Sequence, residues 1–305
     1  MNALPISEFK FNKFSQYGED GVIKEILSRI CAVSTLDQWC CEFGAWDGLH
    51  LSNTARLILE DGYKGVLIEG DPKRVEELGI NFPGNEILKI CSFVTYSGDT
   101  SLDKILQGTE IPVDFDFLSI DIDGMDYWIL DSLQTYRPKL ICIEFNPSIP
   151  NSVHFVQEKN TNVKHGSSAK AIAELAVDKG YRLVAATQCN LLLVRSDFAK
   201  DVIPVFPTIE EVVPLGNDPQ YIFCGYDGTI LSNKQFIQLG WHETFPITKI
   251  QVLPIFLRKY SGDYNVIESK LFHLYHFLSR ENRVRFLIKG IHRRSLRLLS
   301  NFKSN

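Results

Sequence analysis

The chain has 305 residues, of which 45% are hydrophobic and 23% are charged, and its formal net charge is −5. This balance is typical of a globular protein with an ordinary core, and it excludes a disordered or fibrous chain. The seven cysteines are odd in number and lie mostly in apolar runs, which predicts reduced core residues rather than a disulfide framework or a zinc site.

The two ends of the chain make different predictions about membranes. The N-terminus has no basic-then-apolar signal segment, and no run of 18 apolar residues occurs, so we expect a cytoplasmic protein without a transmembrane span. Residues 280–305 carry eight Lys or Arg against one Glu, a net charge of +7, with apolar residues interleaved at roughly helical spacing.

This basic tail leaves two interpretations open. It could be an amphipathic helix on an anionic membrane surface, which would place the protein peripherally at the inner face of the membrane. It could equally be a solvated helix that covers the acidic body. No nucleic acid is expected as a partner.

Along the body, apolar runs alternate with helical patterns, which is typical of βαβ units and a mostly parallel sheet. The sequence predicts an α/β, Rossmann-like seven-stranded sheet over residues 1–200, an extension at 201–279 and the basic tail at 280–305. Helices are predicted over residues 16–30, 53–61, 72–78, 101–107, 126–136 and 168–179. Strands are predicted over residues 39–45, 65–70, 86–94, 116–123 and 139–146, followed by an antiparallel hairpin at 181–195.

The first predicted strand runs into the turn "EFGAWDG", residues 42–48. Gly44 and Gly48 permit a sharp turn close to a ligand, while Glu42 and Asp47 add carboxylates. A dinucleotide fingerprint avoids an acid at this place because the pyrophosphate is anionic. The turn therefore favours a cationic ligand such as S-adenosylmethionine. Glu69 ends the next strand at the spacing typical of an acid that binds ribose hydroxyls.

A second group of carboxylates follows the strand in "FLSIDIDGMD", residues 117–126. Asp121 and Asp123 share one face by strand alternation, as do Glu144 and Asn146 at the end of the next strand. Crowded carboxylates need a cation, a raised pKa or basic partners, and oxygen ligands suit Mg²⁺ or Mn²⁺. The alternative for Asp123 and Asn146 is a purely local role in a helix cap and a turn.

Several segments together resemble the FkbM-like S-adenosylmethionine-dependent methyltransferases, and within them a bacterial group associated with surface-glycan genes. The segments are "SQYGEDGVI" (15–23), "EFGAWDGLHLSNT" (42–54), "LIEGDPKR" (67–74), "FLSIDIDGMDYW" (117–128), "LICIEFNPSIP" (140–150), "FVQEKN" (155–160) and "HGSSAKAIAELAVDKGY" (165–181). The resemblance covers about residues 15–195. It implies a class I methyltransferase fold, S-adenosylmethionine as cofactor, and methyl transfer to an oxygen of a sugar or glycan precursor.

Site residues follow from the resemblance together with the strand ends. The expected cofactor-binding residues are Glu42, Gly44, Asp47, Gly48, Glu69, Asp71 and Ser92. The expected catalytic residues are Asp121, Asp123 and His165, and the expected ligands of a divalent metal are Asp121, Glu144 and Asn146. The expected acceptor-side residues are Gln16, His50, Asn53 and His154.

A sugar hydroxyl does not ionise by itself at neutral pH, so its proton must be removed during in-line methyl transfer. Either a bound metal lowers the pKa of the hydroxyl, or a carboxylate or histidine acts as general base. Both routes stay open on the sequence alone.

Two other classes of protein also remain possible on these residues. One is a metal-dependent sugar transferase that uses Asp121 and Asp123 as a DxD motif. The other is a non-catalytic module of a glycan assembly complex at the membrane edge. A phosphatase is less consistent with the order of elements, because its nucleophile strand normally opens the domain.

Overall fold

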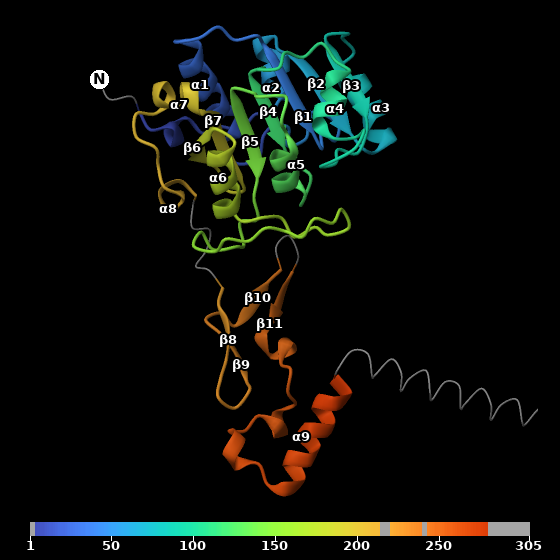
Figure 1. Ribbon diagram of the computed structural model, residues 1–305, viewed down its shortest axis with the longest axis vertical. Helices are drawn as coiled ribbons and strands as arrows, with labels where there is room; N and C mark the ends of the chain where they lie inside the picture. The colour runs from blue at the N-terminus through green and yellow to red at the C-terminus, as the bar shows by residue number, and fades with distance from the viewer. Residues whose placement is uncertain (1–3, 214–219, 240–242, 280–305) are drawn as a thin grey trace, which may run out of the picture. The chain divides into compact units, whose positions relative to one another are not determined.

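The computed structural model describes residues 4–213, 220–239 and 243–279. The chain divides into two compact units, Met1–Pro219 and Gln220–Asn305, and each is described by itself (Figure 1). The predicted basic tail at 280–305 lies outside the described residues. None of the described helices combines the length and apolar character needed to cross a membrane.

A seven-stranded sheet forms the centre of the first unit, with the order β3-β2-β1-β4-β5-β7-β6. The five strands from β1 to β5 are parallel, and β7 is antiparallel to both β5 and β6. This confirms the predicted Rossmann-like sheet with its C-terminal hairpin. The strands are β1 (Trp39–Phe43), β2 (Lys64–Glu69), β3 (Ile87–Cys91), β4 (Phe117–Ile120), β5 (Leu140–Glu144), β6 (Tyr181–Ala186) and β7 (Asn190–Arg195).

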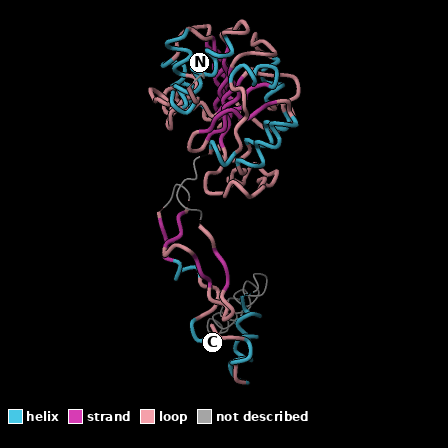
Figure 2. Tube along the Cα trace, turned by 90° about the vertical axis from the view of Figure 1, so that its left-hand side faces the viewer, coloured by secondary structure: helices cyan, strands magenta, loops and turns pink. Residues whose placement is uncertain are grey.

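Helices cover both faces of this sheet, and Figures 1 and 2 show the strands between them. One face packs against α4 (Leu102–Gln107), α5 (Asp126–Ser132) and α6 (Ala169–Asp178). The other face packs against α1 (Glu19–Cys31), α2 (Ala55–Asp61), α3 (Pro72–Asn81) and α7 (Ser196–Val202). The short helices η1 (Ile6–Phe9) and α8 (Ile209–Val212) complete the unit.

Local sequence explains where several of these helices begin. Asp71 caps α3, where its side chain accepts a hydrogen bond from the backbone of Lys73, and Pro72 occupies the first helical position. Ser168 caps α6 in the same way, with the backbone of Ala171 as donor. Helix α1 follows Gly18, whose φ of +100° is accessible to glycine.

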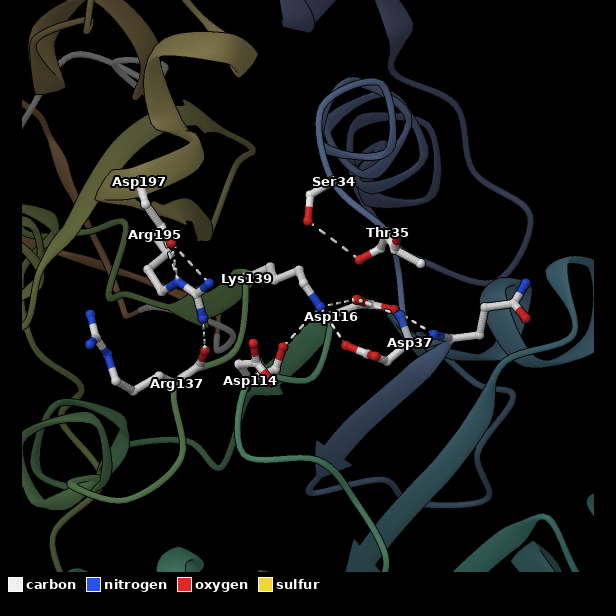
Figure 3. A network of polar contacts seen from close by, with 10 residues as sticks. Ser34, Thr35, Asp37, Asp114, Asp116, Arg137, Lys139, Arg195 and Asp197 are labelled. Atoms are coloured by element: carbon white, nitrogen blue, oxygen red, sulfur yellow. Dashed lines mark hydrogen bonds and ion pairs between the residues drawn. The ribbon is translucent and has the colours of Figure 1, made fainter.

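Charged residues are buried at the edge of the sheet where the parallel strands begin (Figure 3). Lys139 precedes β5, and its ammonium group lies 2.8 Å from Asp116 and 2.6 Å from Asp37. Asp116, which precedes β4, also accepts hydrogen bonds from the backbone N–H groups of Asp37 and Gln38. This network joins the loop before β1 to the starts of β4 and β5, and it lies at the edge opposite the candidate site.

The second unit consists of two small hairpins and helical segments. Strand β8 pairs with β9, and β10 pairs with β11, each antiparallel. Among the described residues, the three hydrophobic clusters of buried side chains all belong to the first unit. The elements are β8 (Ile222–Cys224), β9 (Ile230–Ser232), β10 (Phe236–Gln238), β11 (Thr244–Pro246), η2 (Ile247–Ile250), η3 (Ile255–Leu257), η4 (Ser261–Asp263) and α9 (Val266–Ser279).

Several strands are shorter than predicted, and for β4 this changes the argument that rested on it. Strand β4 ends at Ile120 rather than at residue 123, and Asp123 has φ = +58°, which a strand does not permit. The backbone N–H groups of Ile122 and Gly124 donate hydrogen bonds to the side chain of Asp126 instead of to a neighbouring strand. The premise that Asp121 and Asp123 share a strand face is therefore wrong, because the chain has already turned.

Candidate active site

The turn after β1 is built around close backbone contacts. Gly44 has φ = +72°, and a Cβ there would lie 2.0 Å from the carbonyl oxygen of Asp121. Gly48 has φ = +78°, and its Cβ would overlap the ring of Phe82. Glycine is therefore required at both positions for packing and for backbone conformation. The β1 turn and the end of β4 consequently lie against each other.

Asp47 keeps its charge within this turn. Its Oδ1 accepts hydrogen bonds from the backbone of Leu49 at 2.9 Å and of His50 at 2.7 Å. Desolvation acts to raise the pKa of Asp47, but these backbone donors outweigh it, and the pKa lies below its ordinary value. The predicted carboxylate thus stays ionised in the turn, as binding of a cationic ligand requires.

Glu42 lies beneath the turn rather than at its surface. It is buried, and its carboxylate accepts hydrogen bonds from the hydroxyls of Ser52 and Thr54, both at 2.6 Å, and from the backbone of Asn53 at 2.8 Å. Burial raises its pKa, and these donors counteract the shift. The structure places Glu42 as the anchor of the segment that leads into α2, so a direct contact with a cofactor stays a prediction.

The ends of β2 and β3 form the neighbouring wall. Glu69 accepts hydrogen bonds from the backbone of Trp46 at 2.9 Å and of Asp71 at 2.8 Å, so its carboxylate joins the first two turns of the edge. The backbone of Ser92 donates to the carbonyl of Glu69. The side chain of Asp71 is engaged in capping α3, as described above.

An exposed aromatic ring lies at the same place, and the sequence argument did not single it out. Phe93 follows Ser92, and its ring packs over Gly70, where a Cβ would lie 2.2 Å from the ring. The side chain is 74% exposed. Exposed Trp46 lies in the turn after β1, with the guanidinium of Arg74 4.1 Å from its ring centroid. Exposed aromatic faces beside a strand edge are suited to stacking on a base.

Three carboxylates meet where β4 and β5 end. Asp121, Asp123 and Glu144 each offer an oxygen within 4.8 Å of the others. Burial and the neighbouring acids raise the pKa values of both Asp121 and Glu144, and the two side chains share a hydrogen bond. This pair therefore holds a proton near neutral pH. Exposed Asp123 lies 3.7 Å from the ammonium group of Lys164.

A second layer of polar residues lies beside this carboxylate cluster. Asn190 of β7 is directly opposite Glu144 in the antiparallel register, so the two side chains share a face of the sheet. The Asn190 amide nitrogen donates to buried Glu19 at 3.2 Å, while its buried Oδ1 has no partner. Glu19, at the start of α1, also accepts a hydrogen bond from the Thr187 hydroxyl. The Asn190 Oδ1 is a hydrogen-bond acceptor without a partner beside acidic side chains, so it is suited to bind a donor or a cation.

The loop after β5 uses Asn146 and Gln157 to hold itself in place. The Asn146 amide donates to the carbonyl of His165 at 2.6 Å, and its oxygen accepts from the backbone and hydroxyl of Ser148. Both ends of the predicted metal ligand are therefore occupied, and ligation would require these bonds to break. Buried Gln157 accepts from the backbone of His165 and Gly166 and donates to the carbonyl of Val163. His165 itself is exposed on this loop.

The predicted acceptor-side residues belong to different loops of the first unit. His154 is exposed and lies 3.3 Å from Glu174 of α6. Asn53 is buried and donates to the Ser119 hydroxyl of β4 at 3.0 Å, and His50 is exposed on the β1 turn. Gln16 lines a surface pocket of about 410 Å³ with Tyr17 and Gln188 among its walls. Their roles toward an acceptor stay predictions.

The sequence argument missed four further residues of the site, and the signals for them differ. Asp126, Glu19 and Gln157 lie in the segments that carry the family resemblance, so their presence there was a visible signal. Asn190 carries no such signal, because its importance comes from Glu19 and Glu144, which are far away in the sequence.

A known family model matches the part of the chain that contains the carboxylate cluster. Residues 97–183 match the family model described as the methyltransferase FkbM domain. No curated protein matches the chain.

Similar solved structures are distant in sequence. TrmK of M. capricolum, in complex with S-adenosyl-homocysteine, is 13% identical with a TM-score of 0.33, over 55% of this chain and 65% of that chain. An S-adenosylmethionine-dependent methyltransferase from Aquifex aeolicus is 12% identical with a TM-score of 0.35, over 62% and 94%. The mitomycin 7-O-methyltransferase MmcR is 16% identical with a TM-score of 0.33, over 57% and 55%.

This chain thus spans less than two thirds of the TrmK and MmcR chains, and these likenesses do not identify its ligands. The family match at residues 97–183 includes α4, β4, α5, β5 and α6, and with them Asp121, Asp123 and Glu144. The part of the chain that carries these three carboxylates therefore matches the methyltransferase FkbM domain.

Proposed function

We propose that the protein is an S-adenosylmethionine-dependent O-methyltransferase that acts on a hydroxyl of a sugar or glycan precursor. The observation that carries the proposal is the proton-sharing pair of Asp121 and Glu144 at the ends of β4 and β5, packed against the ionised β1 turn. A positively charged methyl donor would then lie beside a carboxylate that can accept a proton.

The cofactor fits the chemistry of the residues at the β1, β2 and β3 ends. Asp47 supplies a negative charge for a sulfonium or ammonium group, and Glu69 supplies carboxylate oxygens for ribose hydroxyls. The exposed Phe93 ring offers a stacking surface for adenine. When bound, S-adenosylmethionine supplies an electrophilic methyl group.

The carboxylate pair supplies the base. Asp121 would accept the proton of the acceptor hydroxyl, because its raised pKa lies closer to neutral pH than that of an ordinary aspartate. Glu144 donates a hydrogen bond to Asp121 and thereby holds it in position.

A divalent metal also fits this cluster. Asp121, Asp123 and Glu144 would be its ligands, and the unpartnered Oδ1 of Asn190 beside Glu144 is consistent with a cation or a metal-bound water. Bound Mg²⁺ or Mn²⁺ would lower the pKa of the acceptor hydroxyl. The choice of a sugar acceptor rests on the resemblance to proteins associated with surface-glycan genes.

Calorimetric titration tests the cofactor directly. We expect S-adenosylhomocysteine to bind, and Asp47→Asn and Glu69→Gln to weaken binding by at least about tenfold, or about 1.4 kcal/mol. Phe93→Ala should weaken it about as much, while Ile80→Ala, which removes an exposed apolar residue of α3, should leave it unchanged. Binding of a UDP-sugar with Mn²⁺ and none of S-adenosylhomocysteine would instead identify a DxD sugar transferase.

Metal dependence requires a separate titration. Mn²⁺ is titrated into the protein saturated with S-adenosylhomocysteine, and Asp121→Asn with Glu144→Gln should abolish the binding isotherm. The matched control is Asp99→Asn, an exposed acid on another loop. If wild-type protein transfers methyl groups at full rate in excess EDTA, Asp121 acts as general base without metal.

A further inference from the structure

Many large apolar side chains of the second unit are exposed. On α9, the residues Ile267, Leu271, Leu274 and Leu278 are 70%, 42%, 53% and 37% exposed. Their spacing of four, three and four residues places them in one stripe along the helix. The neighbouring η3 adds Ile255 and Phe256, which are also exposed. We call the four α9 residues the α9 stripe.

A different face of α9 attaches the helix to its own unit. The rings of Phe272 and Tyr264 are 5.6 Å apart, the Tyr275 hydroxyl donates to the carbonyl of Val252 at 2.6 Å, and Glu268 pairs with Lys259. These three α9 residues, Glu268, Phe272 and Tyr275, are each offset by one position from the stripe, which is about 100° around an α-helix. The α9 stripe is therefore not the face that holds the helix in place.

The two units carry net charges of opposite sign. Residues 220–305 contain 13 Lys or Arg and five Asp or Glu, a net charge of +8, although the chain as a whole carries −5. The remainder, residues 1–219, therefore carries −13. The basic residues of 280–305 follow directly after the α9 stripe in the sequence.

From this combination we infer that α9 docks the protein on the surface of an anionic lipid bilayer. The α9 stripe would enter the boundary between headgroups and acyl chains, and the basic residues that follow would bind lipid phosphates. A negatively charged surface attracts the second unit and repels the first. A nucleic acid would use the positive charge but not an apolar stripe, and a second copy of the chain would bring like charges together.

Vesicle flotation tests the inference with the full-length chain. Vesicles contain phosphatidylcholine alone or phosphatidylcholine mixed with phosphatidylglycerol. We expect the protein to float with the mixed vesicles, to be released by high salt, and to stay unbound with phosphatidylcholine alone. Flotation requires neither a methyl donor nor an acceptor, so its result is independent of the proposed activity.

Two matched double variants distinguish vesicle binding through the α9 stripe from nonspecific binding by exposed apolar residues. Leu271→Ser with Leu274→Ser shortens the α9 stripe without changing charge and should lower vesicle partition at least about tenfold. Ile80→Ser with Val205→Ser removes two apolar residues of the first unit that are 78% and 76% exposed, and it should float like wild type. All these side chains are exposed, so circular dichroism and thermal unfolding should match wild type in both variants.

Three results would overturn the inference. One is wild-type protein that fails to float, and another is a stripe variant that floats as well as wild type. The third is a lipid-free dimer in sedimentation velocity that Leu271→Ser with Leu274→Ser converts to a monomer, because the α9 stripe would then be an interface between copies.

Discussion

At the level of single residues, the site depends on buried carboxylates that are stabilised by neutral donors. Glu42 has no basic partner among its hydrogen bonds, and it relies on neighbouring hydroxyls and a backbone N–H. Such a group is costly to bury unless every donor is in place. Its role is to fix the segment between the β1 turn and α2.

Replacement of Glu42 by Gln should therefore destabilise the first unit. Both hydroxyls donate to Oε2 and the Asn53 backbone donates to Oε1, so an amide nitrogen at either place leaves at least one donor without an acceptor. We expect a loss of about 1–3 kcal/mol in the free energy of unfolding. Urea denaturation measures this value. Ser52→Ala, which removes a single donor, should cost less, and an equal or greater loss in Ser52→Ala would contradict the assignment.

Asp126 should give the first unit a defined pH dependence. Burial raises its pKa from 3.8 to about 6, although the backbone of Gly124 and Ile122 donates to it. Because the folded state then binds the proton more tightly than the unfolded state, stability falls as the pH rises from about 4 to about 6, by up to about 3 kcal/mol.

Asp126→Asn should lack this step, because its side chain does not ionise. Urea unfolding of both proteins between pH 4 and pH 7 measures how the free energy of unfolding of each changes with pH. Asp121 and Glu144 are present in both proteins, so the comparison isolates Asp126. Parallel stability curves for variant and wild type would rule out a raised pKa at Asp126.

Lys139 should be the most sensitive residue at the opposite edge of the sheet. Its removal by Lys139→Met leaves the buried carboxylate of Asp116 without its cation, and we expect a loss of about 3–5 kcal/mol in urea unfolding. Asp37→Ala removes the partially exposed partner and should cost under about 1 kcal/mol. Similar losses in the two variants would show that Asp116 does not depend on the ion pair.

At the level of elements, the position of the β1 turn is set by contact with the end of β4. Gly44 and Gly62 have nearly the same φ, +72° and +71°. A Cβ at Gly44 would meet the Asp121 carbonyl, whereas a Cβ at Gly62 would meet nothing within 4 Å. The two glycines therefore separate backbone strain from steric overlap.

Gly62→Ala should cost about 1–2 kcal/mol, which is the penalty for a left-handed residue with a Cβ. Gly44→Ala should cost at least about 2 kcal/mol more, and it should also weaken S-adenosylhomocysteine binding because it displaces the turn from Asp121. Urea unfolding and calorimetry measure both effects. Equal costs at the two positions would mean that the turn adapts without strain.

The elements themselves could be predicted well from the sequence, and their ends less well. Each predicted strand from the first to the hairpin has an observed counterpart, because alternation and apolar runs are local signals. The predicted end of β4 at residue 123 was wrong, since the side chain of Asp126 takes the N–H groups that a longer strand would have used. A hydrogen bond of this kind depends on three-dimensional placement.

At the level of the whole molecule, the first unit contains the described buried clusters and the whole candidate site. A chain of residues 1–219 should therefore fold by itself and bind S-adenosylhomocysteine with the affinity of the full-length protein. Thermal unfolding and calorimetry check this expectation. A truncated chain that is unfolded or does not bind would show that the second unit completes the first.

By itself, the sequence determined the order of strands and helices, the acidic glycine turn after β1, the acids at the ends of β4 and β5, and the basic C-terminal end. These features are local, because each depends on residues next to one another in the chain. Only the tertiary structure decided that Glu19, Asn190 and Glu144 meet beside Asp121, that Asn146 and Gln157 hold a loop, and that Phe93 covers Gly70. Strand order and register bring these residues together, and no spacing in the sequence records which strands become neighbours.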